Sequence, residues 1–259
     1  MPELPDVELY LSSLRARVAG HALDRVRLGT PFLLRSVEPP LNLAEGRVVT
    51  GFRRIGKRIV WELEGELFLV FHLMIAGRFK WRERGAAVAR RVGLAAFDFA
   101  HGTLLLTEAA TQKRASLHVV QGEAALGSFN PGGLEVMTSD TTAFAAALQK
   151  ESHTLKRALT DPHLFSGIGN AYSDEILHRA RLSPFKLTRQ LTAEEIGVLH
   201  AAVFTTLAEW TARLKDETGE KFPEKVTAFH EGMAVHGRFG KPCPRCSSPV
   251  QRINRKSVV

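Results

Sequence analysis

Residues 153–177 read HTLKRALTDPHLFSGIGNAYSDEIL, and this stretch decides the fold of the half of the chain that contains it. Its first part has a helical composition and stops at Pro162, because proline cannot continue a helix. Two turns follow, and a second helix starts after the Gly-Ile-Gly sequence at 167–169. The two glycines allow backbone N–H groups to converge at the start of this helix, where they can hold a phosphate group. A plain helical hairpin is the alternative, because Gly-Ile-Gly alone is a weak signal.

Helical composition continues on both sides of this stretch. Windows rich in Ala, Leu and Glu cover 142–150 and 193–214, and strand signals disappear there. Asn170 stands at the start of the second helix, where its side chain can cap the helix or donate a hydrogen bond to a phosphate oxygen. The sequence therefore predicts a helical domain over 134–225.

The first half of the chain has a different pattern. Apolar residues at spacings of four, three and four predict an amphipathic helix over 6–18. Short runs rich in Val, Ile, Phe and Trp follow at a spacing close to ten residues, namely 58–63, 67–73, 94–99, 103–107 and 117–120. This spacing is typical of an antiparallel sandwich or barrel. We therefore predict an α+β protein whose β-sandwich domain covers 1–133 and ends at a turn rich in Gly and Pro.

Composition limits the class of protein further. The chain has 259 residues, 44 % of them hydrophobic, with 35 Lys and Arg against 27 Asp and Glu, which gives a formal charge of +8. This composition excludes a disordered chain, and no apolar run is long enough to span a membrane. The acidic start is unlike a signal peptide, and two cysteines exclude a disulfide scaffold, so we expect a reducing cytoplasm.

The basic residues are clustered, which favours a nucleic-acid partner over an evenly charged surface. Six basic residues and one acid lie within 78–91, and no acid follows Glu231, whereas Arg and Lys continue to the end. Clusters far apart in the sequence fit a surface that follows a phosphate backbone. Solvated loops are the alternative for any one cluster.

The first residues carry a candidate nucleophile. A small second residue permits removal of Met1, which leaves Pro2 as a free secondary amine. An α-amino group titrates near pH 7.7–8, so part of it is neutral and can attack an electrophilic carbon to form an iminium ion. Glu3 is placed to move protons beside it. The alternative is that the prolines merely begin a helix.

Lys57 and a cysteine pair are the other candidates for chemistry. Gly56 suggests a tight turn that presents Lys57 at a sheet edge, although a lysine there also discourages aggregation. Cys243 and Cys246 have the spacing of a zinc knuckle, but a structural zinc site needs four ligands. His230 and His236 are conceivable partners at unfamiliar spacings, and a redox pair lacks a supporting βαβ context.

Taken together, these motifs resemble the formamidopyrimidine-DNA glycosylase and endonuclease VIII family. The resemblance rests on the start Pro-Glu-Leu-Pro-Asp-Val-Glu at 2–8, on Gly-Lys at 56–57, on 155–177 and on 237–246. Pro-Glu-Leu-Pro is closer to the formamidopyrimidine branch. The resemblance implies a β-sandwich, a helix-two-turn-helix domain and a C-terminal zinc hairpin, here residues 226–259.

The resemblance also implies the activity, which is excision of a damaged base, expected to be oxidised, and cleavage of the strand by β- and δ-elimination. Pro2 would attack the sugar, Glu3 would be its acid/base partner, with Asp6 nearby, and Lys57 would donate a proton. Double-stranded damaged DNA would lie in a cleft between the domains with the target base flipped out. We expect a monomer at the nucleoid. Matching positions imply DNA contacts by His72, Met74 or Ile75, Arg114, Lys156, Asn170 and Tyr172.

This chain departs from the family pattern at three places. Met74 and Ile75 stand in the turn that inserts into the DNA, where Gly-Met is common. Ala115 stands where an aromatic wedge is usual, so we expect a preference for abasic or weakly paired targets. The second cysteine pair would lie beyond Val259, so Cys243 and Cys246 are half a site. For the 259-residue chain we expect absent or sub-stoichiometric zinc and a mobile segment from Lys241 onward.

Two other functions remain open at this point. A non-catalytic reader of damaged DNA would have a similar surface, but it would not need Pro2, Glu3 and Lys57 together. An RNA-binding protein is the third hypothesis, and no aromatic platform in the sequence supports it.

Overall fold

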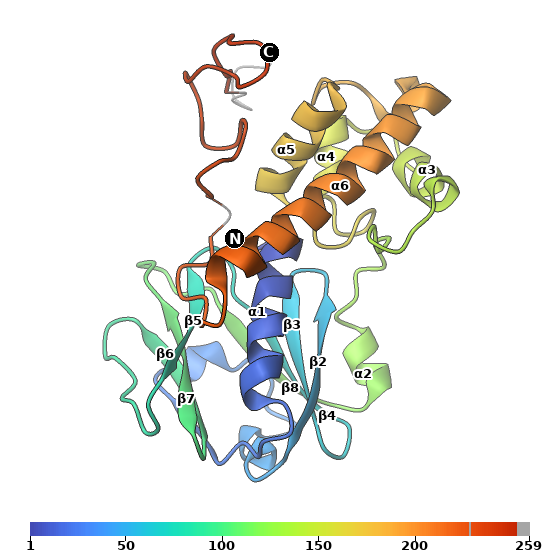
Figure 1. The fold of residues 1–259 in the computed structure, drawn as a ribbon. Coiled ribbons are helices and arrows are strands. Elements are labelled where there is room, and N and C mark those ends of the chain that lie inside the picture. Colours follow the sequence, from blue (N-terminus) through green and yellow to red (C-terminus); the bar gives the residue numbers. More distant parts are fainter. Residues whose placement is uncertain (228, 253–259) are drawn as a thin grey trace. The chain divides into compact units, whose positions relative to one another are not determined.

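The computed structural model describes residues 1–227 and 229–252, which form two compact units (Figure 1). Unit 1 contains Met1–Gly133 together with Glu209–Thr227. Unit 2 contains Leu134–Ala208 together with the described residues after 228. The described C-terminal residues therefore group with the helical unit, and the zinc-hairpin segment expected over 226–259 stays a prediction.

Unit 1 is a sandwich of two antiparallel sheets of four strands each. In order across the sheet, the first contains β1 (Arg25–Leu28), β6 (Gly93–Phe99), β7 (Gly102–Glu108) and β5 (Gly77–Arg82). The second contains β2 (Val49–Ile55), β3 (Arg58–Leu63), β4 (Leu67–His72) and β8 (Ser116–Gln121). The prediction of an antiparallel sandwich is confirmed.

Aromatic side chains hold the two sheets together. Trp61 and Phe71 on the second sheet both contact Phe97 on the first, each with ring centroids 5.3 Å apart, and all three rings are completely buried. Large buried aromatic rings contribute much of the apolar area that drives folding. The runs of Val, Ile, Phe and Trp in the sequence are thus the inner layer of the sandwich.

Helix α1 (Leu4–Val18) lies against the second sheet, beside β2 and β3 (Figure 1). Val7, Leu11, Leu14 and Val18 are all buried, as their spacing predicts. Short elements complete the unit: η1 (Pro31–Leu33), η2 (Leu41–Ala44) and α2 (Glu123–Gly127).

Unit 2 is helical. Its elements are α3 (Thr141–Gln149), α4 (Leu155–Thr160), α5 (Asn170–Ala180), η3 (Thr188–Gln190) and the first part of α6 (Ala193–Thr218). Asp140 caps α3 by accepting the N–H of Ala143 at 2.7 Å, and Arg181 ends α5 in the left-handed conformation with φ 57°. Helices α4 and α5 with the two turns between them form the motif that the sequence predicts. No helix among the described residues is long and apolar enough to cross a membrane.

Candidate active site and DNA-binding surface

The start of α1 is fixed by a reciprocal pair of hydrogen bonds. Asp6 accepts the backbone N–H of Glu3 at 2.8 Å, and the Glu3 side chain accepts the backbone N–H of Asp6. This capping box satisfies two N–H groups that a helix start otherwise leaves unpaired. Glu3 is 3 % exposed and Asp6 is completely buried, so the residues that precede the helix are held in one place.

The N-terminal amine lies among charged groups in this corner of unit 1. Burial lowers the pKa of the ammonium below its usual value of 8.0, Glu3 and Asp6 oppose that shift, and Arg78 and Lys57 add to it. A lower pKa increases the fraction of neutral amine, which is the nucleophilic form, at neutral pH. Removal of Met1 would make Pro2, the neighbour of Glu3, the residue with the free amine.

Lys57 reaches the same corner from the hairpin between β2 and β3. Ile55 pairs with Arg58, so Gly56 and Lys57 form a two-residue turn, and Gly56 has a φ of 59° that suits glycine. Arg54 ties this hairpin to α1 through Glu8 at 3.1 Å. Burial lowers the pKa of Lys57, and the charge of Glu3 partly opposes that shift.

His72, at the end of β4, is the third basic group of the corner. Burial, together with the charges of Arg58, Lys57 and the N-terminus, lowers its pKa from 6.5 to about 4. Its Nδ1 accepts the backbone N–H of Met74 at 3.1 Å, which places the proton of the neutral ring on Nε2. His72 is therefore an uncharged hydrogen-bond donor at neutral pH.

The turn after His72 exposes one large apolar side chain. Leu73 accepts the N–H of Gly77 at 2.9 Å, which closes the turn, and Ile75 at its tip is 64 % exposed. Met74 has a φ of 52°, the left-handed conformation that costs a residue with a side chain about 1–2 kcal/mol. Of the two candidates for insertion into DNA, the geometry favours Ile75.

The loop between β7 and β8 presents Arg114. The Glu108 carboxylate accepts the N–H groups of Arg114 at 2.9 Å and of Ala115 at 3.1 Å, which folds the loop inward. Ala115 is 3 % exposed, so its position faces the core and not the solvent. Arg114 is exposed and donates to the side chain of Gln112 at 2.9 Å, a neighbour that the sequence analysis did not single out.

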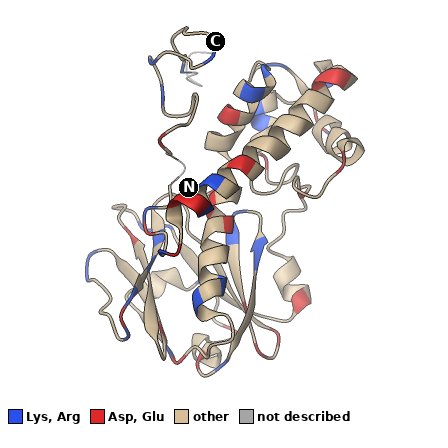
Figure 2. Cartoon of the chain, viewed as in Figure 1, with Lys and Arg blue, Asp and Glu red and all other residues tan. Residues whose placement is uncertain are grey.

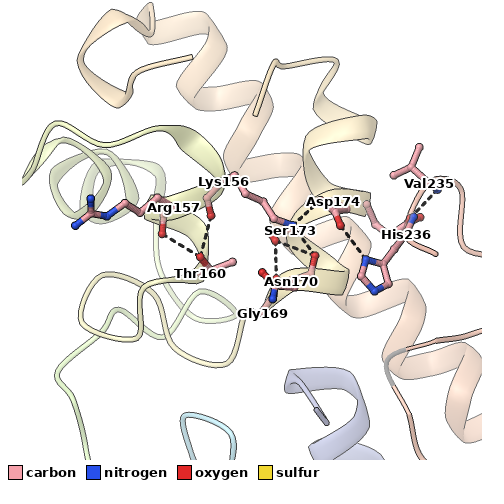
Figure 3. A network of polar contacts seen from close by, with 10 residues as sticks. Lys156, Arg157, Thr160, Gly169, Asn170, Ser173, Asp174, Val235 and His236 are labelled. Atoms are coloured by element: carbon pink, nitrogen blue, oxygen red, sulfur yellow. Dashed lines mark hydrogen bonds and ion pairs between the residues drawn. The ribbon is translucent and has the colours of Figure 1, made fainter. Parts of the chain in front are cut away.

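In unit 2, Lys156 is held at the start of α5. Its Nζ donates to the Asn170 carbonyl at 2.6 Å and to Asp174 at 2.5 Å (Figure 3). The other oxygen of Asp174 meets Nδ1 of His236 at 2.8 Å. Burial alone would raise the pKa of Asp174, but the hydrogen bond from His236 and the Lys156 ammonium lower it overall. Lysine has three donors, and the third can bind a phosphate oxygen.

Two residues of the same motif differ from expectation. Gly169 is the N-cap of α5 and Asn170 is the first residue of the helix, so Asn170 does not cap it; its exposed side chain is available to a ligand. Tyr172 is completely buried in the core of unit 2. The resemblance implied that Tyr172 touches DNA, and the structure instead gives it a packing role.

The charge clusters are partly neutralised within the protein. Arg82 on β5 pairs with Glu224, and Arg84 pairs with Asp24 at 3.4 Å. Arg90 and Arg91 are exposed and lie between β5 and β6. Figure 2 shows the basic residues of both units in blue. Only part of the 78–91 cluster is therefore free to meet an anion.

The cysteine pair lies in a short hairpin near the C-terminus. Cys243 meets Nε2 of His178 on α5 at 3.3 Å, whereas His236 is bound to Asp174. Within the described residues no group of three or more His, Cys, Asp or Glu side chains is arranged to hold a metal ion. The described residues do not fit a four-ligand zinc site. No sequence motif points to His178, because only the folded chain brings it to Cys243.

Sequence profiles of known families match both units. The profile described as Formamidopyrimidine-DNA glycosylase N-terminal domain matches residues 1–119, and the Formamidopyrimidine-DNA glycosylase H2TH domain matches residues 133–220. A formamidopyrimidine-DNA glycosylase of Moorella thermoacetica is 31 % identical over 98 % of this chain and 94 % of its own length. The Thermus thermophilus protein of the same name is 34 % identical over 97 % of this chain and 93 % of its own.

Solved structures share the fold. The Lactococcus lactis protein in complex with DNA that contains an oxidized pyrimidine has a TM-score of 0.84, and the same protein bound to DNA with an AP site has a TM-score of 0.83. Both are 24 % identical to this chain. The matches cover 98 % and 97 % of this chain, and 94 % of the solved chain in each case.

The two profiles cover the sandwich and the helix-two-turn-helix motif, and both describe one class of DNA glycosylases. Identity above 30 % over nearly the whole chain places it within that class. The chain belongs to the formamidopyrimidine-DNA glycosylase family.

Proposed function

We propose that the amine of Pro2, freed by removal of Met1, is the nucleophile of this base-excision repair enzyme. As a family member the chain is a bifunctional DNA glycosylase and abasic-site lyase that acts on damaged DNA. The amine nitrogen forms a bond to the sugar C1′ while the bond from C1′ to the base breaks, and the base leaves with a proton. The nitrogen then loses its proton, the C1′–O4′ bond breaks as O4′ takes up a proton, and the opened sugar is linked to Pro2 as an iminium ion. This iminium ion withdraws electrons from the sugar, which allows β- and then δ-elimination of the phosphates.

The observation that carries this proposal is the place of Pro2, directly before a Glu3 that is fixed by the capping box, in a corner where Lys57 and the N-terminus lie close enough to affect each other's charge. Glu3 is the general acid/base for base release, because its carboxylate lies close enough to affect the pKa values of both amines. Lys57 has a lowered pKa, so it can exchange a proton during elimination more readily than an exposed lysine.

Side chains in both units would grip the DNA. We assign phosphate contacts to His72, Lys156 and Asn170, because each offers a donor on the surface of its own unit. Ile75 would fill the space of the flipped nucleotide, backed by Met74, and Arg114 would contact the base left behind. We propose that the enzyme works at chromosomal DNA in the cytoplasm.

Borohydride trapping tests the nucleophile. Reduction of the iminium ion should link the wild-type protein to DNA that contains an abasic site, and Pro2→Gly should reduce the rate of trapping by about 100-fold or more. Glu66→Gln, an exposed position in the turn between β3 and β4 of the same unit, is the matched control and should trap normally.

Mass spectrometry of the mature N-terminus accompanies the trapping experiment. Loss of Met1 is expected. Retention of Met1, or trapping of Pro2→Gly through a lysine at the wild-type rate, would overturn the assignment. A protein that binds abasic DNA tightly but neither traps nor cleaves it would be a reader and not an enzyme.

A further inference from the structure

Glu175 on α5 is used entirely within the protein. It is 6 % exposed, and its carboxylate accepts three consecutive backbone N–H groups, from Ala234 at 2.8 Å, Val235 at 2.9 Å and His236 at 2.9 Å. Hydrogen bonds to a charged acceptor are about twice as strong as those between neutral groups. This single side chain therefore fixes the path of the chain at 234–236.

Further contacts continue along the same helix. Asp174, the residue before Glu175, meets the His236 ring at 2.8 Å. One turn later Arg245 donates to the carbonyl oxygen of His178 at 2.7 Å, where a cation also interacts favourably with the C-terminal end of a helix. Cys243 contacts the His178 ring. The stretch 234–245 is thus attached to α5 at two places, one helical turn apart. Its first residues bind Asp174 and Glu175, and its last residues bind His178.

The hairpin beyond this attachment is closed by its own backbone. Gly240 donates to Val250 at 2.9 Å, Val250 donates to Lys241 at 2.9 Å, and Cys243 donates to Ser248 at 2.8 Å. All three are hydrogen bonds between backbone groups, so they do not depend on a bound metal ion. They connect residues 240–250 into one piece that follows the attached stretch.

We call residues 234–252 the basic segment; its cations are Arg238, Lys241, Arg245 and Arg252. We propose that Glu175 is the positioning residue that docks the basic segment on α5, so that the segment contributes its cations to DNA binding without a bound metal ion. The proposal rests on the proposed function for its DNA partner. The docking itself rests only on contacts within unit 2.

Glu175→Gln is the direct test, because it keeps the shape of the side chain. The amide group would direct an N–H₂ donor at backbone N–H donors, which cannot bond to one another. Glu194→Gln is the matched control, since Glu194 is exposed on α6 of the same unit and loses the same charge.

Binding to a duplex with an abasic-site analogue is measured at several salt concentrations, with and without EDTA. Glu175→Gln should raise the Kd about 10-fold and make the slope of log K against log salt shallower by about 2, as expected when about two phosphate contacts are lost. In strand cleavage the KM should rise while kcat at saturating DNA stays within about twofold. The wild-type protein and Glu194→Gln should keep their Kd and slope in EDTA.

Limited trypsin digestion reports the docking without any DNA. The basic segment contains Arg238 and Arg245 as trypsin cleavage sites, and Glu175→Gln should be cut there several-fold faster than wild type. Arg245→Met removes the contact at the other end of the stretch from an exposed position, so it serves if Glu175→Gln fails to fold. It should also accelerate cleavage at Arg238, the trypsin site that this variant keeps.

The outcomes separate this proposal from the proposed function. Equal digestion and binding by Glu175→Gln and Glu194→Gln would overturn the docking role. EDTA that exposes the wild-type segment to trypsin and weakens its binding to the level of Glu175→Gln would show that a metal holds the segment, and would also overturn it. Faster digestion of Glu175→Gln in a protein that neither traps nor cleaves DNA would support the docking and refute the proposed function.

Discussion

The environment of the basic groups differs between two regions. One is the corner at the start of α1 in unit 1, and the other is the junction of α4 and α5 in unit 2. In the corner the N-terminal amine, Lys57 and His72 are partly buried, and burial is the largest cause of the lowered pKa of each. At the junction Lys156 is held by a carboxylate and a backbone carbonyl, and Asn170 beside it is exposed.

The difference separates groups suited to catalysis from groups suited to DNA binding. Desolvation favours the neutral forms of bases, and a neutral base can attack carbon or exchange a proton. A cation that keeps its charge near solvent instead attracts phosphate, at long range and without regard to sequence. Substitutions of Glu3 and Lys57 in the corner should therefore change rates and pH profiles, whereas substitutions at the junction should change affinity and its dependence on salt.

The largest effect is expected for Glu3→Gln. Base release from a damaged duplex should slow by about 100-fold, since general acid/base catalysis contributes about 10²–10⁴. Trapping on DNA with a preformed abasic site should change less than about fivefold. Single-turnover assays on the two substrates measure the ratio of the two rate losses, with Glu66→Gln as control. Equal losses on both substrates would assign Glu3 to the amine step and not to base release.

The next largest effect concerns stability and pH. The folded-state pKa of His72 is about 4 against 6.5 when unfolded, so between these values the unfolded chain binds more protons. Stability should fall as the pH drops from 6.5 to 4, and the His72 contribution to that fall is about 3 kcal/mol.

His72→Asn keeps an acceptor for the Met74 N–H and removes the titration. Urea unfolding at pH 7 and pH 4 gives the free energy of unfolding of both proteins at each pH. The loss of stability between pH 7 and pH 4 should be smaller in the variant. Identical pH dependence would mean that His72 is solvated in solution and would weaken the contrast between the two regions.

A smaller effect is expected at the junction. If the protein neutralises roughly six phosphates, log K should fall with log salt with a slope of about −5. Lys156→Ala should weaken binding about 10-fold on damaged and undamaged duplexes alike and make the slope shallower by about 1. Lys150→Ala, an exposed lysine of the same unit, is the control. Loss of kcat at saturating DNA would contradict the division between catalysis and DNA binding.

The smallest effect concerns the turn at the edge of the corner. Met74→Gly relieves the left-handed backbone and should stabilise the protein by about 1 kcal/mol. Glu66, with a φ of 55° in another turn, is matched in conformation, so Glu66→Gly should stabilise it similarly. Only Met74→Gly should alter cleavage of a base-paired lesion, because it loosens the turn that carries Ile75. Equal cleavage by both variants would remove Ile75 from the DNA surface.

How well the sequence predicts each strand depends on its place in the sheet. The interior strands β3, β4, β6 and β7 are apolar runs and were predicted, whereas β1, β2 and β5 are edge strands and were missed. Edge strands need fewer apolar residues and carry charges, as in Arg25–Leu28, so periodicity does not reveal them. The remaining edge strand, β8, is covered because Leu34 pairs with Leu117. A covered edge can be apolar, so the sequence predicts this strand as it predicts the interior ones.

The site residues also differ in how well the sequence predicts them. Local motifs point to Pro2, Glu3 and Lys57, and in the structure the N-terminus, Glu3 and Lys57 lie close enough to affect one another's charge. Glu175 and His178 have no local signal, because their partners lie about 60 residues away along the chain. Tyr172 was assigned to DNA from its motif, and only packing reveals that its ring faces the core.

The capping box at Glu3 has a consequence for how the protein matures. Because α1 begins at Leu4 and its first N–H groups are satisfied by Glu3 and Asp6, Met1 contributes no hydrogen bond to the helix. An exopeptidase can therefore remove Met1 from the nascent chain without weakening the fold that develops around it. Exposure of the nucleophile and folding of the scaffold are then independent events, and neither has to wait for the other.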